Sequence, residues 1–215
     1  MSMAMPAELD HLVVAGATLA QAIEYVADLT GVTPRPGGQH VAMGTHNALV
    51  RLGDRVYLEL IAIDPSLPRP PRARWFDLDV AAMQAALGDR PRLVHWVART
   101  NDLERAIANA KVDPGRAHAM SRGDFRWRIT IPDDGRRPGG GVLPTLIQWD
   151  VARHPADGLP NDGVTLVELA ASHPSPETIR RALAALGLAD ALRVTYGAPP
   201  RLAAMLRTPR GLVTL

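Results

Sequence analysis

The sequence predicts an α+β fold built from two β-α-β-β-β modules, with a partial third module at the C-terminal end. A short apolar segment with one histidine, residues 9–16, returns 84 residues later as residues 93–99. His11 and His95 occupy the same place in the two copies, and the register continues without a gap into a helix signal. Three strand-like segments then follow each helix. We interpret this pattern as an internal duplication.

The composition is typical of a soluble globular protein. A chain of 215 residues with 47% hydrophobic content can bury a sizeable core, and the absence of cysteine excludes disulfides and thiolate metal sites. There is no leader-like segment, and no apolar run approaches the ~20 residues of a membrane span, so we expect a cytoplasmic protein without a membrane partner. The net charge of +2 gives no reason to expect nucleic acid as a partner.

The first module is expected over residues 8–64. A capping box at Thr18 predicts a helix that continues to about Thr30, where Gly31 favours its end. Prolines and glycines at 34–38 predict a turn. The three strands that should complete the module are residues 40–43, 47–52 and 56–63.

The linker and the remaining modules are predicted from the same kinds of signal. Residues 65–91 form a linker that begins with four prolines up to residue 74 and ends with a short helix at 77–87. The second module is expected over residues 92–155, with a helix starting near residues 101–104, strands at 117–120, 125–131 and 143–149, and a glycine-rich loop at 133–141. The partial third module, residues 160–215, should pack on the same domain, with strands at 164–169, 192–196, 201–206 and 212–215 and a helix that begins near 175–177.

If the two modules are equivalent, Glu59 and Gln148 are also counterparts, because both lie in the last strand of their module. His11, Glu59, His95 and Gln148 then come from two equivalent places and could meet in one site. Two imidazoles and a carboxylate form a ligand set suited to Fe(II), Mn(II), Zn(II) or Ni(II), with an amide oxygen as a weak fourth ligand. Open coordination positions would polarise a substrate oxygen. The alternative for His11, His95 and Gln148 is a hydrogen-bonded structural role, whereas Glu59 could instead pair with an arginine or face solvent.

Several segments resemble the vicinal oxygen chelate superfamily, which includes glyoxalase I, extradiol dioxygenases and bleomycin-resistance proteins. The resemblance covers roughly residues 8–155 and is greatest to the glyoxalase-like branch. The segments that carry it are residues 9–14, 37–40, 44–49, 52–53, 57–61, 126–128 and 146–149. It implies curved mixed sheets that close around a cup holding a divalent metal and a ligand. The segment from residue 160 onward is similar to an extension found in that branch.

The resemblance leaves two classes of function open. One is a metal-dependent lyase, isomerase or dioxygenase that acts on a small oxygenated and, in one alternative, anionic molecule, with Glu59 as the catalytic base. Glutamine at position 148, where glyoxalase I-like sites commonly have glutamate, weakens the isomerase alternative. The other class is a non-catalytic protein that binds or sequesters a small molecule and has a vestigial metal site. The sequence also leaves a homodimer open.

Five further residues are candidates for contact with a substrate. His40, His46 and Asn47 lie beside glycine turns, where a pocket rim and a surface loop are equally plausible. Arg126 and Arg128 share one face of a strand because side chains alternate along it. On the cup side they would grip a carboxylate or phosphate, whereas on the other side they would form an ordinary solvated face.

Overall fold

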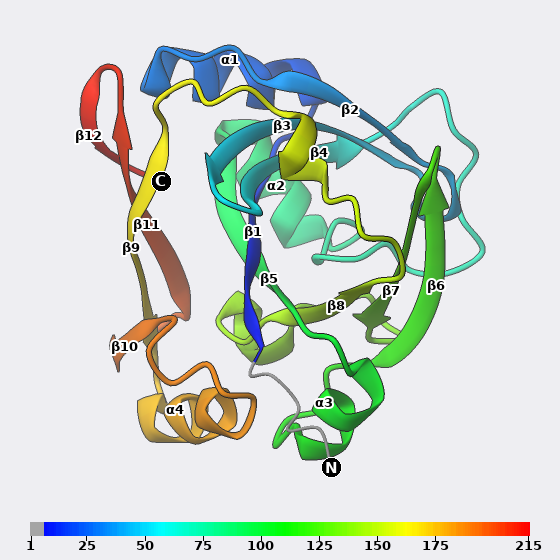
Figure 1. Ribbon diagram of the computed structural model, residues 1–215, viewed down its shortest axis with the longest axis vertical. Coiled ribbons are helices and arrows are strands. Elements are labelled where there is room, and N and C mark those ends of the chain that lie inside the picture. Colours follow the sequence, from blue (N-terminus) through cyan, green and yellow to red (C-terminus); the bar gives the residue numbers. More distant parts are fainter. Residues whose placement is uncertain (1–6) are drawn as a thin grey trace.

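The main element of the structure, a computed structural model that describes residues 7–215, is a curled eight-stranded sheet (Figure 1). Its strand order is β2-β3-β4-β1-β5-β8-β7-β6, so the two halves repeat one order on either side of the central β1·β5 pair. In this antiparallel pair His11 lies opposite Val97, and Val13 lies opposite His95. A shift of 84 residues exchanges these two pairings, as a twofold axis between the modules requires. The predicted fold class is confirmed.

The elements follow the repeat of the two modules. The first module contains β1 (Glu8–Ala15), α1 (Leu19–Thr30), β2 (Arg35–His40), β3 (Thr45–Gly53) and β4 (Val56–Ile63). The linker carries α2 (Ala81–Asp89), and the second module contains β5 (Arg92–Arg99), α3 (Leu103–Asn109), β6 (Arg116–Arg122), β7 (Phe125–Ile131) and β8 (Thr145–Trp149). The C-terminal segment contains β9 (Thr165–His173), α4 (Pro176–Ala185), β10 (Arg193–Tyr196), β11 (Arg201–Thr208) and β12 (Gly211–Thr214). Short 3-10 turns lie at Val41–Met43 (η1), Pro138–Gly141 (η2) and Pro155–Gly158 (η3).

The first module differs from its prediction at one place, the segment between α1 and β3. Residues 34–38 were expected to form a turn and residues 40–43 a strand, but the strand is β2 (Arg35–His40) and a 3-10 turn follows it. β2 is an edge strand that, among the strands of residues 7–215, pairs only with β3, and the register shifts between Pro36 and Gly38. An edge strand with a bulge tolerates proline because the missing N–H is not needed for a second neighbour.

The linker crosses the concave side of the main sheet, which we call the cup. Trp75 and Phe76, which we call the plug, pack there against strand residues such as Val13 and Ile129. The short helix begins at Ala81, four residues later than expected. Phe76 and Asp77 have φ values of 61° and 60°, which an α-helix cannot accommodate. The linker therefore fills the cup before it becomes helical.

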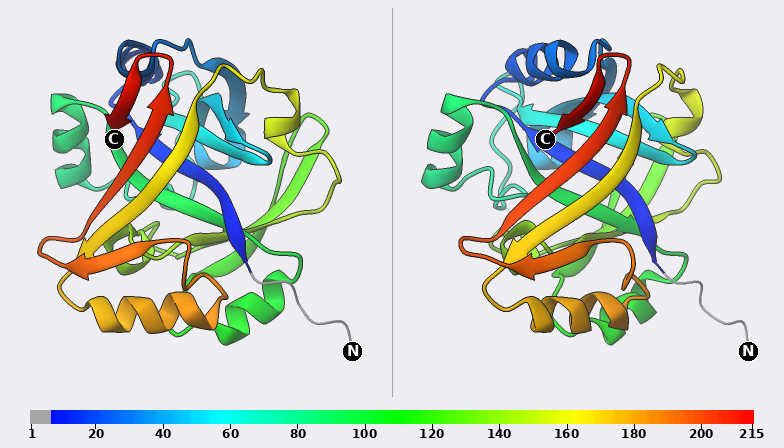
Figure 2. Two further views of the ribbon diagram at one scale, coloured as in Figure 1. Left: turned by 60° about the vertical axis from the view of Figure 1, so that its left-hand side comes forward. Right: turned by 90° about the vertical axis from the view of Figure 1, so that its left-hand side faces the viewer.

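The C-terminal segment forms a second sheet with the order β10-β9-β11-β12. This sheet crosses the outer, convex face of the main sheet over β1 and β5 (Figure 2). Its buried residues, among them Leu169 and Leu206, belong to one hydrophobic cluster with Leu12, Trp96 and Leu146 of the main sheet. The two sheets share a core. Within residues 7–215, no helix has the length and apolar character needed to cross a membrane.

Candidate functional site

A cluster of polar side chains lies on the otherwise apolar wall of the cup, at the first module. Alternation along β1 directs His11 to the same face as Val13, and the parallel register sets Val13 beside Glu59 of β4. The His11 Nε2 atom is 3.6 Å from Glu59 Oε2, and the Asn47 side-chain amide donates a hydrogen bond of 2.6 Å to Glu59 Oε1. His11 and Glu59 are only 4% and 5% exposed, so these contacts take the place of water.

Asp10 orients His11 from behind. The register of β1 against β5 shifts between Leu9 and His11, and this irregularity allows the Asp10 carboxylate to lie 2.6 Å from His11 Nδ1. The other Asp10 oxygen accepts hydrogen bonds from Trp149 Nε1 at 2.9 Å and from His154 Nε2 at 3.1 Å. Burial by itself raises the pKa of Asp10, but the hydrogen bonds from the two histidines hold that pKa well below its usual range.

The ionised Asp10 carboxylate determines which nitrogen of each histidine carries a proton. Such a carboxylate only accepts hydrogen bonds, so His11 Nδ1 must donate, and the Nε2 atom is then directed toward Glu59. His154 Nδ1 accepts from the backbone N–H of Ala156 at 3.2 Å, which leaves its Nε2–H for Asp10. With the proton on Nδ1, His11 Nε2 is a proton acceptor that lies 3.6 Å from the Glu59 carboxylate, so two acceptors face the cavity side by side.

Arg122, at the end of β6, brings a positive charge to the cluster. Its guanidinium donates hydrogen bonds of 3.0 Å to Asn47 Oδ1 and to His40 Nε2. Burial, together with the Arg122 charge, lowers the pKa of His40 to about 3, so this imidazole is neutral near pH 7. Within residues 7–215 the Arg122 guanidinium forms no ion pair with a carboxylate. It is therefore available to bind an anion.

Aromatic side chains enclose the cluster and leave a cavity of about 20 Å³. This is enough for one water molecule. Tyr57 stacks on the His11 ring with 4.5 Å between centroids, and the plug residues Trp75 and Phe76 close the other side. Burial, with the nearby Asp10 and Glu59 charges, raises the pKa of Tyr57 well above its usual value, so the phenol remains protonated.

His95, the counterpart of His11, lies in a different environment. Its Nδ1 atom is 3.3 Å from the Gly141 carbonyl oxygen, and its Nε2 atom accepts the backbone N–H of Thr145 at 3.1 Å. Phe76 covers the ring at 5.1 Å. Burial and the nearby Arg137 charge lower the pKa of His95 to about 3. Both ring nitrogens are occupied, so the geometry is that of a structural histidine.

The expected equivalence of Glu59 with Gln148 is wrong. Glu59 lies beside Val13 in the first module, and the residue beside Val97 in the second module is Thr145. Gln148 is three residues further along β8, which places it on the opposite face of the sheet. There its amide oxygen accepts the backbone N–H of Leu103 at 2.8 Å, at the start of α3.

The residues do not fit the metal ion that the resemblance implies. Only His11 and Glu59 of the four expected ligands are adjacent, because His95 is engaged with Thr145 and Gln148 faces away from the cup. His40 does not replace them, since its Nε2 accepts from Arg122. Among residues 7–215 no three histidine, cysteine or acidic side chains are grouped in a way that could hold a metal ion.

Of the five candidates for substrate contact, His40 and Asn47 lie in the cluster and the other three do not. His46 is directed toward Asp64, with 3.4 Å between Nδ1 and the carboxylate. Arg126 and Arg128 point away from the cup because their neighbours Trp127 and Ile129 face it. Arg128 pairs with Asp150 at 3.0 Å, and Arg126 binds backbone carbonyls. Arg126 and Arg128 therefore lie on the solvated face of the strand, which was the second alternative for these residues.

Sequence reasoning missed four members of the site. Arg122 follows no pattern that separates it from the other arginines, and only the strand pairing shows its place. Strict alternation assigns Asp10 to the face opposite His11, so the irregularity in β1 hid its role. Trp149 and His154 are distant in sequence and meet Asp10 only in the folded chain.

The paired β-α-β-β-β modules around a cup define a protein of the vicinal oxygen chelate fold. The chain matches the family described as the glyoxalase-like domain over residues 9–187 and belongs to this family. No curated protein matches it.

Solved structures resemble the chain at low identity. A hypothetical protein from Staphylococcus aureus is 13% identical, with a TM-score of 0.59 over 98% of this chain and 84% of that one. Methylmalonyl-CoA epimerase from Mycobacterium tuberculosis is 23% identical, with a TM-score of 0.44 over 71% and 93% of the respective chains. A variant of the Streptomyces coelicolor epimerase in complex with 2-nitronate-propionyl-CoA is 19% identical, with a TM-score of 0.42 over 68% and 100%. The first of these similarities supports the shared fold.

Proposed function

We propose that the chain binds a small oxygenated anion in the cup and acts on it as an isomerase or lyase by proton transfer. The observation that carries this proposal is the row formed by His11, Glu59, Asn47 and Arg122, because it combines a proton-transfer pair with an unpaired guanidinium. Both are needed to remove a proton from a carbon next to a carbonyl group, since the reaction develops negative charge on the carbonyl oxygen.

The chemistry follows from the position of each group. Asn47 holds one oxygen of Glu59, and the other oxygen is free to accept the proton from the substrate carbon. Arg122 then stabilises the enolate oxygen, and Glu59 returns the proton to the neighbouring carbon. His11, whose Nδ1–H is held by Asp10, accepts the proton of the neighbouring substrate hydroxyl at Nε2 and passes it to the former carbonyl oxygen, so that an α-hydroxy carbonyl compound is isomerised. No step requires the metal, for which the donor set does not fit.

Entry of such a molecule requires the plug to move, because the present cavity accommodates only one water. The turn that holds the plug is strained: Phe76 and Asp77 adopt positive φ values that cost of order 1 kcal/mol each. Arg137 stabilises this turn through an ion pair of 2.7 Å with Asp77. The linker is thus held in the cup by the packing of the two aromatic rings and by the bonds between Arg137 and Asp77.

Binding is tested with oxalate, a small planar dianion that resembles an enolate. Trp75, Trp127 and Trp149 line the cavity, so oxalate binding should change the intrinsic fluorescence. Arg122→Ala should weaken binding at least about tenfold, because a hydrogen bond between charged groups is worth roughly 1.5–3 kcal/mol. Arg126→Ala is the matched control on the adjacent strand and should bind as the wild type does.

Catalysis is tested by deuterium exchange. In D₂O the wild-type protein should accelerate exchange at the carbon next to the carbonyl group of 2-oxo acids and of glutathione hemithioacetals, whereas Glu59→Gln should not. Oxalate binding without deuterium exchange would favour the second candidate function, a non-catalytic protein that binds a small molecule. The small volume of the cavity, about 20 Å³, supports this candidate. Stoichiometric Zn(II), Ni(II), Mn(II) or Fe(II) binding by calorimetry, lost in both His11→Ala and Glu59→Ala, would instead revive the metal-dependent enzyme, with catechols as further substrates to assay.

A further inference from the structure

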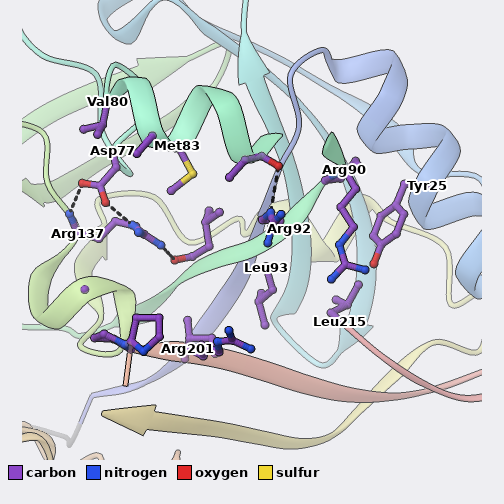
Figure 3. A pocket seen from close by; sticks show the side chains of 18 residues that line it. Tyr25, Asp77, Val80, Met83, Arg90, Arg92, Leu93, Arg137, Arg201 and Leu215 are labelled. Atoms are coloured by element: carbon purple, nitrogen blue, oxygen red, sulfur yellow. Dashed lines mark hydrogen bonds and ion pairs between the residues drawn. The ribbon is translucent and has the colours of Figure 1, made fainter. Parts of the chain in front are cut away.

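A second cavity lies outside the cup, where the linker helix faces the C-terminal sheet (Figure 3). Its volume is about 690 Å³, within the range of ordinary small-molecule pockets. It is bordered by α2, the start of β5, η2 and the beginning of β11. None of its lining residues lines the cavity at His11 and Glu59, so the two sites are separate. We call it the groove.

The groove is lined by four arginines and a single acidic side chain, Asp77. Asp77 is already paired with Arg137 at 2.7 Å. Arg92 donates from Nε to the Ala86 carbonyl oxygen at 3.0 Å, and its pairing with Asp89 is long at 3.7 Å and involves a carboxylate that is 82% exposed. Such an exposed pair contributes little. The Arg92 guanidinium is therefore oriented but not neutralised.

The other two arginines of the groove have no acidic partner. Arg90 and Arg201 take part in none of the ion pairs found among residues 7–215. They come from distant parts of the chain, one directly after α2 and the other at the start of β11, and Figure 3 shows Arg90, Arg92 and Arg201 on different sides of Leu93 in the same cavity. Like charges that gather in a concave surface repel one another and raise the local concentration of anions.

Apolar side chains form the rest of the groove wall. Leu93 lies between Arg92 and Arg201 in Figure 3, and Met83 faces the cavity from α2. Leu202 and Pro200 line the side of the C-terminal sheet. Tyr25 of α1 lies beside Arg90. The groove therefore offers an apolar surface next to unpaired guanidinium groups.

We propose that the groove binds a phosphate ester with an apolar body. A phosphate group carries up to two negative charges and three acceptor oxygens, so it can satisfy Arg90, Arg92 and Arg201 together. One carboxylate has a single charge and would leave most of this positive charge unmet. The apolar body of the ester would cover Met83 and Leu93. A site of this kind is distinct from the proton-transfer site in the cup.

Calorimetry with phenyl phosphate tests the proposal. The wild-type protein should bind one phenyl phosphate per chain at 0.15 M salt, and more tightly than it binds inorganic phosphate or benzoate. Arg90→Ala and Arg201→Ala should each weaken binding at least about tenfold, as expected for a charge-assisted hydrogen bond. Arg207→Ala removes the same charge from the same strand outside the groove and should have little effect.

The outcomes separate this site from the one in the cup. His11→Ala should bind phenyl phosphate as the wild type does, so failure of the proposed enzymatic function would leave this proposal intact. No binding by the wild-type protein would overturn it. Equal losses in Arg201→Ala and Arg207→Ala, or equal affinity for inorganic phosphate and phenyl phosphate, would also overturn it, because binding would then reflect net charge alone.

Discussion

Replacement of Asp10 tests whether this buried carboxylate orients His11. Asp10 is fully buried and accepts from His11, Trp149 and His154. In Asp10→Ala all three donors lose their acceptor. Removal of one partner from a buried charged network typically costs about 3–5 kcal/mol, and we expect a loss of this size in the free energy of unfolding.

Asp10→Asn should be milder and more informative. The amide oxygen can still accept from Trp149 and His154, which preserves two of the three hydrogen bonds and limits the loss to about 1–3 kcal/mol. The amide N–H then faces His11 Nδ1, so this atom must accept and the ring proton moves to Nε2. The tautomer of His11 should therefore switch.

The assays are urea unfolding and nitrogen-15 NMR of the imidazole rings. The pKa of Asp10 in the folded chain is well below its unfolded value of about 3.9, so its stabilisation is complete above about pH 4 and is lost as the pH falls further. Asp10→Asn should show less loss of stability than the wild type over that acid range. Equal stability of wild type, Asp10→Asn and Asp10→Ala, or an unchanged His11 tautomer in Asp10→Asn, would refute the reasoning.

Three further predictions follow from the second module and the C-terminal sheet. Burial and the Arg137 charge hold the pKa of His95 at about 3, below its unfolded value of about 6.5. The contribution of the neutral His95 to stability is therefore complete above about pH 6.5. Below that pH the free energy of unfolding falls by up to ~1.4 kcal/mol per pH unit. In His95→Gln, the free energy from urea unfolding should therefore depend less steeply on pH between these two pKa values. Gln148→Ala should cost about 1 kcal/mol of stability, because the Leu103 N–H at the start of α3 loses its acceptor, and should leave oxalate binding unchanged; a loss of binding would return Gln148 to the site. Deletion of residues 160–215 should abolish the cooperative thermal transition, because it uncovers the convex face of the main sheet; a sharp transition at the wild-type temperature would show that the C-terminal sheet is dispensable.

The sequence predicted the fold more completely than the site, and the physical reason is periodicity. Apolar alternation and the helix signals at Thr18 and Gly31 depend only on residues close together in the chain, so a single sequence is enough to recognise them. His11 was predicted from the internal repeat and Glu59 from its place in the last strand of its module, and the structure brings them together. Whether they bind metal or substrate remains a prediction.

Other features of the site depend on register, which a single sequence does not encode locally. Thr145, the true counterpart of Glu59, and Gln148 are three residues apart and therefore lie on opposite faces of β8. The predicted metal ligand in the second module, Gln148, thus faces away from the cup. Arg122 reaches the cup only because β6 ends there. The sequence predicts the plug only as part of the linker at residues 65–91, since nothing in Trp75 and Phe76 alone reveals the surface that they cover.

The plug makes the linker an intramolecular competitor of whatever enters the cup. Trp75 and Phe76 are tethered to both modules and are therefore present at a high effective concentration that no dilution reduces. The observed affinity for a ligand equals its intrinsic affinity multiplied by the fraction of molecules with the linker displaced. A substitution that stabilises the closed linker by about 1.4 kcal/mol thus weakens ligand binding about tenfold. Conformational stability and ligand affinity should change in opposite directions along this segment.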